Sequence, residues 1–372
     1  MEANVVSGKE KSAKRTWAIL GGGNGGQSAA GHLGMLGYPV RLYDIFEESV
    51  NVINAQGGVK VEGVIEGFGK VDFATTDMAK AVTGADIVMV IAPAIAHRDI
   101  AGKLAAHVKK GQIVFVHPGA TLGALEFNQV FTSKGVEFGS VTICEAQSLI
   151  YATRLVTNGT VSIKGIKKSL TVGALPATRT AEVVAVLRDA FPQIYAARNV
   201  LETSLTNLNA VMHPTPSLLN ASLIESKWDW KYYLDGITPS IGALVERLDK
   251  ERVAIGKAVG LDLPDVIATY KAMYDVEAPT LSETVKLVKA YWEIAGQKKI
   301  DTRYMLEDIP MGLVPMTEIA DKFGVPCEIM KTIVKLGNFL LDRDLSTTGR
   351  TLKNLGLEKM SKEAFLKFID RG

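Results

Sequence analysis

Four apolar residues, Trp17–Leu20 (WAIL), lead directly into a glycine-rich turn, Gly21–Gly26 (GGGNGG), and this stretch decides the fold of the first half of the chain. The first, third and sixth residues of the turn match the GxGxxG spacing, which predicts the phosphate-binding turn of a Rossmann-type domain. Gly21 permits a tight turn and Gly23 lets a pyrophosphate approach the backbone. Gly26 lets the following helix pack close to the strand. Free N–H groups at the start of that helix bind phosphate. The predicted dinucleotide contacts in this turn are Gly21, Gly23, Asn24, Gly25 and Gly26.

A carboxylate at the end of the second strand selects between the two common dinucleotides. Val40–Tyr43 is the predicted strand and Asp44 follows it, near the ~20-residue spacing that the motif requires. A carboxylate here accepts hydrogen bonds from the adenine ribose and repels a 2′-phosphate, so NAD is expected rather than NADP. The alternative is a structural turn with an aspartate at a strand end. His117, after a later strand, is expected to line the nicotinamide pocket, with catalysis as the alternative.

Short apolar runs alternate with helical patterns in the first half of the chain, and helical patterns dominate the second half. Continuous apolar runs such as Asp86–Ile91 and Gln112–Val116 are typical of parallel strands buried on both faces. Further strands are expected at Val59–Ile65, Val71–Ala74, Val141–Cys144, Val161–Lys164 and Ser169–Val172, the last two extending the sheet. The predicted fold is α/β, with a Rossmann-type NAD-binding domain over residues 1–202, of which 1–16 form a flexible tail, and an all-helical substrate and catalytic domain over residues 203–372.

Helix signals organise the second half. Thr238 and Pro239 predict the start of a long helix that Gly260 closes, and Ser282 is expected to cap another helix. Pro326 is expected to open a helix whose apolar face contains Ile329, Ile333, Leu336 and Leu340. Arg303–Pro315 contains two prolines and a glycine and is expected to be a loop.

Composition excludes several classes of protein. The 372 residues carry 42 basic and 40 acidic side chains, too balanced for a nucleic-acid binder that relies on phosphate neutralisation. Cys144 and Cys327 lie far apart, so neither a disulfide framework nor a cysteine metal site is expected, and a reducing cytoplasm fits. The apolar run Ile87–Ile95 is much shorter than the ~20 residues that cross a bilayer. No secretory signal pattern is present, and we expect a cytoplasmic protein without a membrane partner.

Candidate acid–base groups come from the helical half. His213 is the only histidine there, and Pro214 must kink or end a helix beside it. Histidine is the commonest proton donor, although a lone histidine is also often a core residue. Arg303 offers a planar fork for a carboxylate and Asp308 could orient a histidine; the alternative is a solvated salt-bridged connection.

Together these features resemble the opine dehydrogenase family, which contains octopine, nopaline and N-carboxyethyl amino-acid dehydrogenases. The resemblance covers nearly the whole chain. Besides the glycine turn with Asp44, it is carried by Glu145–Arg154 (EAQSLIYATR), Asn209–Pro214 (NAVMHP) and Arg303–Pro315 (RYMLEDIPMGLVP).

The resemblance implies an NADH-dependent enzyme that condenses the amine of an L-amino acid with a 2-oxo acid such as pyruvate, through an imine, and runs the reverse oxidation. It implies that His213 is the acid–base group, Asp308 its partner, Arg303 a carboxylate-binding residue and Glu145 a residue beside the substrate cleft. Thr153 stands where the family more often has cysteine.

Two alternatives stay open at this point. One is an NAD-dependent dehydrogenase of a small alcohol or 2-hydroxy acid, of the glycerol-3-phosphate or ketopantoate type, which would use a lysine for proton transfer. The other is a non-catalytic NAD(H) sensor. The sequence does not specify the preferred amino acid, the stereochemistry or the oligomeric state, for which a homodimer is one option.

Overall fold

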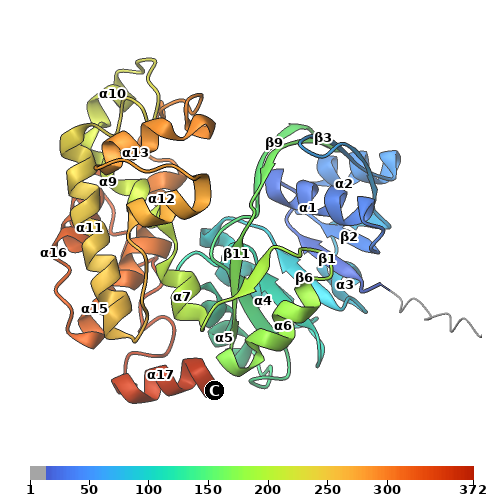
Figure 1. Ribbon diagram of the computed structural model, residues 1–372. Helices are drawn as coiled ribbons and strands as arrows, with labels where there is room; N and C mark the ends of the chain where they lie inside the picture. The colour runs from blue at the N-terminus through green and yellow to red at the C-terminus, as the bar shows by residue number, and fades with distance from the viewer. Residues whose placement is uncertain (1–13) are drawn as a thin grey trace, which may run out of the picture.

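A mostly parallel sheet forms the centre of the first half of the computed structural model, which describes residues 14–372 (Figure 1). The expected tail, residues 1–16, lies mostly outside the described residues. The sheet has the strand order β12-β11-β8-β7-β6-β1-β2-β5. Its strands are β1 (Trp17–Leu20), β2 (Val40–Tyr43), β5 (Phe73–Thr75), β6 (Ile87–Val90), β7 (Ile113–Val116), β8 (Thr142–Ala146), β11 (Leu170–Leu175) and β12 (Ile194–Ala196).

The chain order reverses next to β1, which has β2 on one side and β6 on the other, both parallel to it. Ligands of such sheets bind outside the carboxyl ends of the strands at this switch point. Helices α1 (Asn24–Met35), α2 (Glu47–Gln56) and α6 (Thr180–Leu187) pack on one face of the sheet. Helices α3 (Met78–Val82), α4 (His97–Leu104) and α5 (Gly123–Ser133) pack on the other. The predicted Rossmann-type domain is confirmed.

Two details of the predicted sheet are wrong. The strand expected at Val161–Lys164 is part of β10 (Thr160–Ile166), which belongs to a separate four-stranded sheet, β4-β3-β10-β9. This small sheet also contains β3 (Gly58–Gly63), β4 (Gly67–Lys70) and β9 (Tyr151–Thr157). It can pack directly on α1 because that helix carries glycines: a Cβ on Gly31 would lie 2.5 Å from Val61 Cγ2. In addition, β11 pairs antiparallel with β8, so the main sheet is not wholly parallel.

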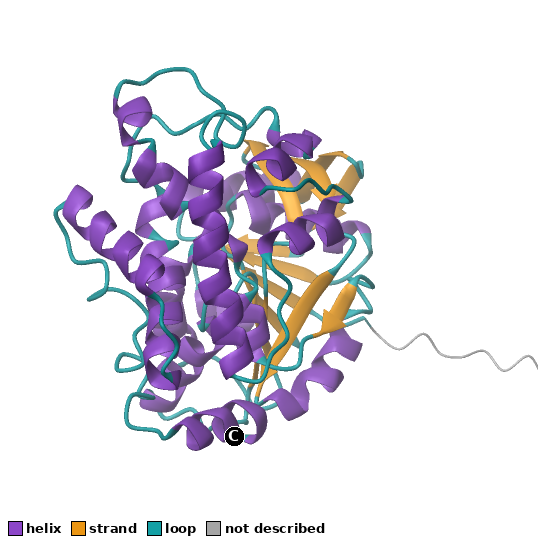
Figure 2. Cartoon of the chain, turned by 60° about the vertical axis from the view of Figure 1, so that its left-hand side comes forward, coloured by secondary structure: helices purple, strands orange, loops and turns teal. Residues whose placement is uncertain are grey.

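The second half of the chain is helical, as predicted (Figure 2). We call residues 14–199 the sheet lobe and residues 200–372 the helical lobe. The helices are α7 (Val200–Leu205), α8 (Leu208–Met212), α9 (Pro214–Leu219), α10 (Ala221–Glu225), α11 (Pro239–Ala258), α12 (Val266–Tyr274), α13 (Leu281–Leu287), α14 (Arg303–Leu306), a π-helix (Ile309–Leu313), α15 (Val314–Phe323), α16 (Glu328–Leu341) and α17 (Lys362–Arg371). None of the helices described is long and apolar enough to cross a membrane.

The helix boundaries confirm one prediction and correct others. Thr238 caps α11 by accepting a hydrogen bond from Ile241 N, as expected. Thr280, not Ser282, caps α13, because its hydroxyl accepts from Glu283 N. The predicted loop Arg303–Pro315 is helical instead: Pro310 and Pro315 stand in the first turns of the π-helix and α15, where a missing N–H costs no hydrogen bond.

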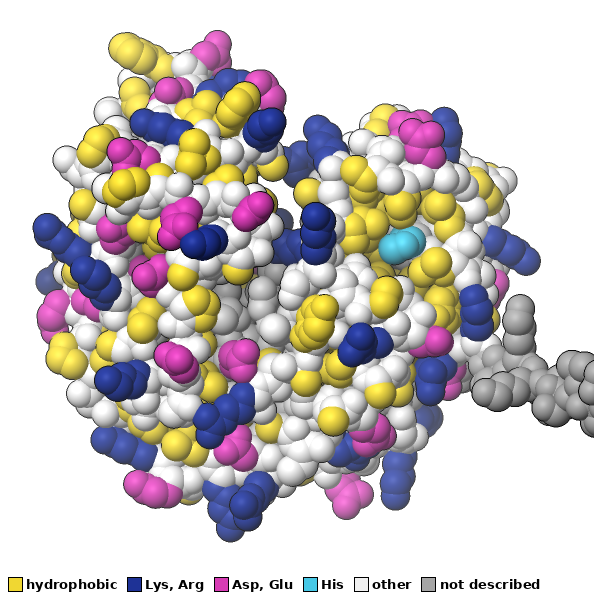
Figure 3. Space-filling view, in the orientation of Figure 1, with side chains coloured by type: hydrophobic (Ala, Val, Ile, Leu, Met, Phe, Trp, Pro, Cys, Tyr) yellow, Lys and Arg dark blue, Asp and Glu magenta, His cyan; other side chains and the backbone are white. Residues whose placement is uncertain are grey.

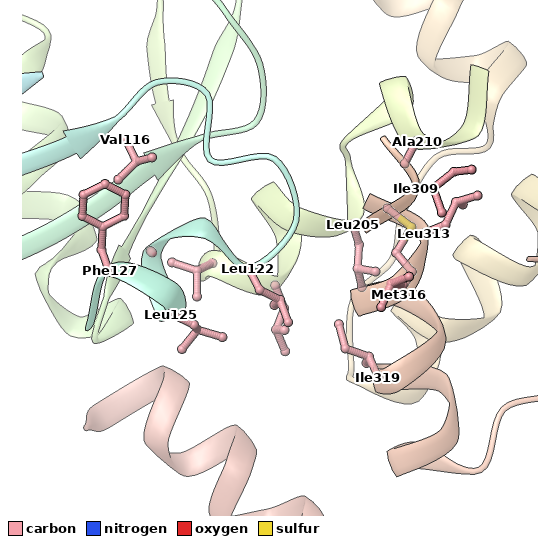
Figure 4. Packing of buried hydrophobic residues seen from close by; sticks show 14 of the residues in the cluster. Val116, Leu122, Leu125, Phe127, Leu205, Ala210, Ile309, Leu313, Met316 and Ile319 are labelled. Atoms are coloured by element: carbon pink, nitrogen blue, oxygen red, sulfur yellow. The ribbon is translucent and has the colours of Figure 1, made fainter. Parts of the chain in front are cut away.

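The apolar face predicted for α16 is only partly buried. Met330 and Ile333 are buried, whereas Leu336 and Leu340 are exposed. The hydrophobic core itself continues from one lobe to the other. Figure 4 shows Leu122 and Leu125 of the sheet lobe and, across from them, Leu205, Leu313 and Met316 of the helical lobe, all in one buried cluster.

The last helix returns to the sheet lobe, beside α5 (Figure 1). Asp370 of α17 accepts a hydrogen bond of 2.9 Å from Asn199 Nδ2, and the rings of Phe368 and Phe138 are 5.5 Å apart. The two lobes are therefore joined at this end of the molecule. The space-filling view shows a hollow between them elsewhere, with lysine and arginine side chains at its upper rim (Figure 3).

Candidate active site

The glycine turn has the geometry that the motif predicts. Gly21 adopts φ +113°, and a Cβ there would lie 2.1 Å from Ile91 O. A Cβ on Gly26 would lie 1.6 Å from Gly21 O, so helix α1 could not pack as closely on β1 with any larger residue. Around the Cβ position of Gly23, by contrast, no atom lies within 4 Å. The backbone is open at the one position where a pyrophosphate must approach it.

Asp44 lies directly beside this turn. A Cβ on Gly22 would be 2.1 Å from Asp44 Oδ2, and Asp44 Oδ1 accepts a hydrogen bond of 2.7 Å from Ile45 N. Burial raises the pKa of Asp44 above its ordinary value, and backbone and side-chain hydrogen bonds oppose that shift. Arg41 donates to the carbonyl oxygens of Ala81 and Thr83 and so does not offer its guanidinium to a 2′-phosphate.

Asn24 connects the turn to the small sheet, because its side-chain Oδ1 accepts a hydrogen bond of 3.1 Å from Leu155 N. The side-chain oxygen therefore anchors β9, and the backbone N–H and the side-chain Nδ2 of Asn24 are the donors at this position. Gly25 packs against Ile91 and Leu149, where a Cβ would lie 2.8 Å and 3.2 Å from the nearest side-chain atoms. Close packing thus explains the glycine at position 25.

His213 and Asp308 form a direct pair in the helical lobe. The distance from His213 Nδ1 to Asp308 Oδ2 is 2.8 Å, and both side chains are almost fully buried. Burial raises the pKa of Asp308, and the hydrogen bond and charge of His213 oppose the increase. The carboxylate fixes Nδ1 as the bonded nitrogen, which leaves Nε2 for a reacting group.

Three tyrosines surround the imidazole. Tyr304 stacks on it with ring centroids 3.8 Å apart and 7° between the planes. Tyr233 OH lies 3.3 Å from Nε2, and Tyr232 OH donates a 2.7 Å hydrogen bond to the carbonyl oxygen of His213. The ring is thus held by polar and aromatic partners, unlike a histidine buried in hydrocarbon.

Breaks in regular helix place both members of the pair. His213 lies between α8 and α9, where Pro214 takes the first position of the next helix. Asp308 precedes the π-helix, and its carbonyl accepts a hydrogen bond from Leu313 N. π-Helical turns occur frequently at functional sites.

Glu307 links this pair to the sheet lobe. Its Oε1 accepts a hydrogen bond of 3.1 Å from Ala94 N, which begins the turn after β6, and its carboxylate also binds Arg303 at 2.5 and 3.0 Å. Because Ile91, three residues before Ala94, touches the glycine turn, the pair stands next to the carboxyl edge of the sheet. Arg303 itself has a side chain 68% exposed and faces outward from this link.

Two predicted site residues, Glu145 and His117, are enclosed in the structure. Glu145 does not border a cleft: it is fully buried, and its carboxylate accepts hydrogen bonds from Thr203 Oγ1, Ser204 Oγ and Ala124 N. These three hydrogen bonds join α7 to α5 inside the protein. This corrects the expectation of substrate contact.

His117 is enclosed at the carboxyl end of β7. It is 1% exposed, its Nε2 accepts a hydrogen bond of 3.1 Å from Ile150 N, and its Nδ1 has no partner among the described residues. Burial, assisted by the charge of Lys167, lowers the pKa of His117 to about 3. The enclosed, neutral ring supports the turn after β7 through Ile150 N, and its place in the lining of the nicotinamide pocket stays a prediction.

Sequence patterns missed Glu307 as a connector and Tyr233 as a neighbour of Nε2. Glu307 lies inside the Arg303–Pro315 stretch, so its position beside Asp308 could have indicated it. The tyrosine follows no motif. Among residues 14–372, no group of three or more His, Cys, Asp or Glu side chains could hold a metal ion.

Comparison with known proteins agrees with both halves of this description. A family model for the alpha-helical domain of NAD/NADP octopine/nopaline dehydrogenase matches residues 196–341, and one for the N-terminus of NAD-dependent glycerol-3-phosphate dehydrogenase matches residues 16–146. Opine dehydrogenase of Arthrobacter sp. (strain 1C) is 39% identical over 348 residues, which cover 93% of this chain and 96% of the relative. Protein ocs of Agrobacterium tumefaciens (strain Ach5) is 27% identical and covers 95% of this chain and 98% of its own length.

Solved structures share the fold. Octopine dehydrogenase in complex with NADH and L-arginine has a TM-score of 0.79 at 21% identity, covering 95% of this chain and 98% of its own. Ketopantoate reductase of Ralstonia eutropha JMP134 has a TM-score of 0.59 at 19% identity, covering 88% of this chain and 98% of its own.

The fold and the turn beside Asp44 define the class, a two-domain NAD-dependent dehydrogenase. The chain belongs to the opine dehydrogenase family, because it is 39% identical to a member of that family over 93% of its own residues. It is an NAD-dependent oxidoreductase of CH–NH groups, whose reaction is the reductive condensation of an amine with a 2-oxo acid. This assignment replaces both the alcohol dehydrogenase and the sensor alternatives.

Proposed function

We propose that this enzyme uses NADH to join the amine of an L-amino acid to a small 2-oxo acid, pyruvate first, with His213 and Asp308 as the acid–base pair. The observation that carries the proposal is the 2.8 Å contact between His213 Nδ1 and Asp308 Oδ2, placed beside the carboxyl edge of the NAD-binding sheet by Glu307. Related octopine dehydrogenase has been solved with NADH and L-arginine and with NADH and pyruvate, which supports these substrate classes.

The pair explains the proton transfers of the reaction. The free amine attacks the carbonyl carbon of the oxo acid, and one of its N–H protons passes to the carbonyl oxygen to give a carbinolamine. Protonated His213 then gives its Nε2 proton to that hydroxyl, which leaves as water, and a protonated imine remains. Bound NADH supplies the hydride that reduces the resulting imine carbon. In the oxidative direction, the neutral Nε2 takes the proton from the secondary amine. Asp308 keeps Nδ1 hydrogen-bonded throughout and stabilises the imidazolium.

Arg303 is the proposed site for a substrate carboxylate. Glu307 binds its Nε and Nη2 edge, and the largely exposed side chain leaves Nη1 without a protein partner among the described residues. Glu307 also orients the guanidinium, and Glu307 is the residue directly before Asp308 in the chain. We therefore propose that the carboxylate bound by Arg303 lies on the same side of the site as Asp308. A planar fork with a fixed orientation favours a carboxylate over a neutral group.

For the cofactor, the free backbone at Gly23 fits a pyrophosphate and the carboxylate of Asp44 fits an adenine ribose without a 2′-phosphate. We propose a cytoplasmic setting, in keeping with two buried free cysteines, Cys144 and Cys327.

A substrate screen tests the function. NADH oxidation is followed at 340 nm with pyruvate alone and with pyruvate plus each L-amino acid. The proposal requires turnover that depends on both substrates and a product in which the amino nitrogen is bonded to the former carbonyl carbon, identified by mass spectrometry. Equal NADH oxidation with the oxo acid alone would contradict it.

A further inference from the structure

Arg350 belongs to no motif, yet its guanidinium is fully buried between the two lobes. It lies in the segment that connects α16 with α17, in the helical lobe, and its side chain enters the sheet lobe. Burying an arginine is costly unless every donor is satisfied and the charge is balanced. The balancing carboxylate is Glu126 of α5, whose Oε2 lies 2.8 Å from Arg350 Nε.

The remaining donors of Arg350 hold two turns of the sheet lobe. Nη1 donates to the carbonyl oxygens of Gly119 and Thr121, both at 2.8 Å, in the turn after β7. Nη2 lies 3.5 Å from Ala94 O, in the turn after β6, and 2.7 Å from Nδ1 of His97, the first residue of α4. Both turns leave the carboxyl ends of strands on the β6 side of the switch point, where the nicotinamide half of a dinucleotide lies in this fold.

His97 can accept this hydrogen bond because its ring is neutral. Burial and the charge of Arg350 lower the pKa of His97 well below its ordinary value, and Nε2 donates to Ala92 O at 3.2 Å. The guanidinium therefore binds acceptors in both turns as well as the carboxylate of Glu126, so its role goes beyond neutralising that carboxylate.

The backbone of Arg350 is bound to the segment that carries the acid–base pair. Arg350 N donates to Pro310 O at 3.1 Å, two residues after Asp308. Next to it, Thr121 N donates to Met311 O at 3.1 Å. One residue thus connects the segment of Asp308, through its main chain, with the turns after β6 and β7, through its side chain.

We propose that Arg350 is a positioning residue that sets the separation between the His213–Asp308 pair and the nicotinamide of bound NADH. It acts through the turns after β6 and β7 and does not touch the reactants. The proposal rests on the proposed role of His213 and Asp308. A rigid connection of this kind is needed because a misplacement of about 1 Å can reduce the rate of a chemical step about 100-fold.

The test compares Arg350→Lys with Arg252→Lys. Arg252 is another fully buried arginine, bound to Asp249, Leu205 O and Pro264 O inside the helical lobe, away from the turns after β6 and β7. Both variants keep the charge and lose the planar fork. For each, we would measure Tm, the Kd of NADH by fluorescence, kcat, and the kinetic isotope effect with NADH deuterated at the transferred position.

For Arg350→Lys we expect a kcat about 10- to 100-fold lower, an isotope effect raised toward the full value for hydride transfer, and an NADH Kd within about twofold of wild type. For Arg252→Lys we expect a lower Tm with kcat and isotope effect unchanged. Equal kcat and isotope effect in Arg350→Lys and wild type would overturn the proposal, as would the same loss of kcat in both variants.

If Arg350→Lys does not fold, Glu126→Gln replaces it, since this variant loosens the guanidinium with little change in volume. A several-fold lower kcat with unchanged NADH Kd supports positioning, and an unchanged kcat contradicts it. Failure of the proposed function is distinguishable, because the wild-type enzyme would then show no turnover that depends on both substrates.

Discussion

Tyr304 lies flat on the imidazole of His213, with 3.8 Å between the ring centroids and 7° between the planes. Together with the hydrogen bond that Nδ1 donates to Asp308, this stack fixes both the plane and the rotation of the ring. The histidine is therefore preorganised for proton transfer from Nε2.

Replacing Tyr304 tests the contribution of the stack. Aromatic pairs contribute about 1 kcal/mol beyond their buried area, so we expect Tyr304→Leu to lower kcat/KM about fivefold to tenfold. Tyr304→Phe keeps the ring and is the matched control, expected to retain near wild-type kcat/KM. Steady-state kinetics with both substrates check this, and equal losses in the two variants would assign the effect to the hydroxyl instead.

The His213–Asp308 pair should behave as one unit. We expect His213→Asn and Asp308→Asn each to lower kcat about 10²- to 10⁴-fold, and the double variant to lose little more than the worse single variant. NADH binding should stay unchanged, because neither residue lies in the glycine turn. Additive losses, or turnover of the double variant within a few-fold of wild type, would show that the two residues do not act together.

Two glycines of the turn should respond differently to the same substitution. Gly23→Ala meets no atom within 4 Å, so it should fold with a nearly unchanged Tm but bind NADH much more weakly. Gly26→Ala would place its Cβ 1.6 Å from Gly21 O and should lower Tm as well. Thermal unfolding and NADH fluorescence titration separate the effects. Normal NADH affinity of Gly23→Ala would place the pyrophosphate elsewhere.

Asp44→Asn should change the choice of cofactor. Without the carboxylate, NADH loses an acceptor for its ribose hydroxyls and NADPH loses a repulsive charge, so the ratio of the two Kd values should move toward NADPH. Because burial raises the pKa of Asp44, its ionised form at pH 7 costs stability, and the variant without ligand should be at least as stable as wild type. An unchanged Kd ratio would contradict the assignment.

His117 should make the enzyme sensitive to acid. Its pKa in the folded protein is about 3, below the 6.5 of the unfolded chain. The stabilisation of the folded state by the neutral ring is therefore fully present above pH 6.5 and is lost as the pH falls from 6.5 toward 3, because the unfolded chain then binds the proton more tightly. The loss is up to ~1.4 kcal/mol per pH unit. His117→Gln retains an acceptor for Ile150 N and should unfold in urea with a weaker pH dependence between pH 7 and 5. An identical dependence would show that His117 is not responsible.

The glycine turn, Asp44 and the two-lobe plan were predictable because each depends on local spacing along the chain. The pairing of His213 with Asp308 came only from the resemblance, since 95 residues separate them and no local pattern relates a helix break to a π-helix. The role of Glu145 could not be predicted either. A carboxylate in a strand can face a cleft or bind hydroxyls of another helix, and only the placement of Thr203 and Ser204 decides between the two.

The π-helical course of Ile309–Leu313 was also hidden. Two prolines and a glycine usually interrupt a helix, whereas here each proline stands at the start of a helical segment, where its missing N–H is tolerated. The antiparallel direction of β11 could not be predicted either. It depends on the side from which the chain re-enters the main sheet after the small sheet, and the spacing of residues carries no information about that path.

The insertion of Arg350 into the sheet lobe limits how this chain can be recombined with others. A chimera that joins its helical half to a dinucleotide-binding half without counterparts of Glu126 and His97 would leave the guanidinium without these two partners. Such a hybrid would bury the charge of Arg350 between the lobes without its carboxylate partner. A chimera should therefore keep Arg350, Glu126 and His97 from the same parent, even though the three residues lie in different halves of the chain.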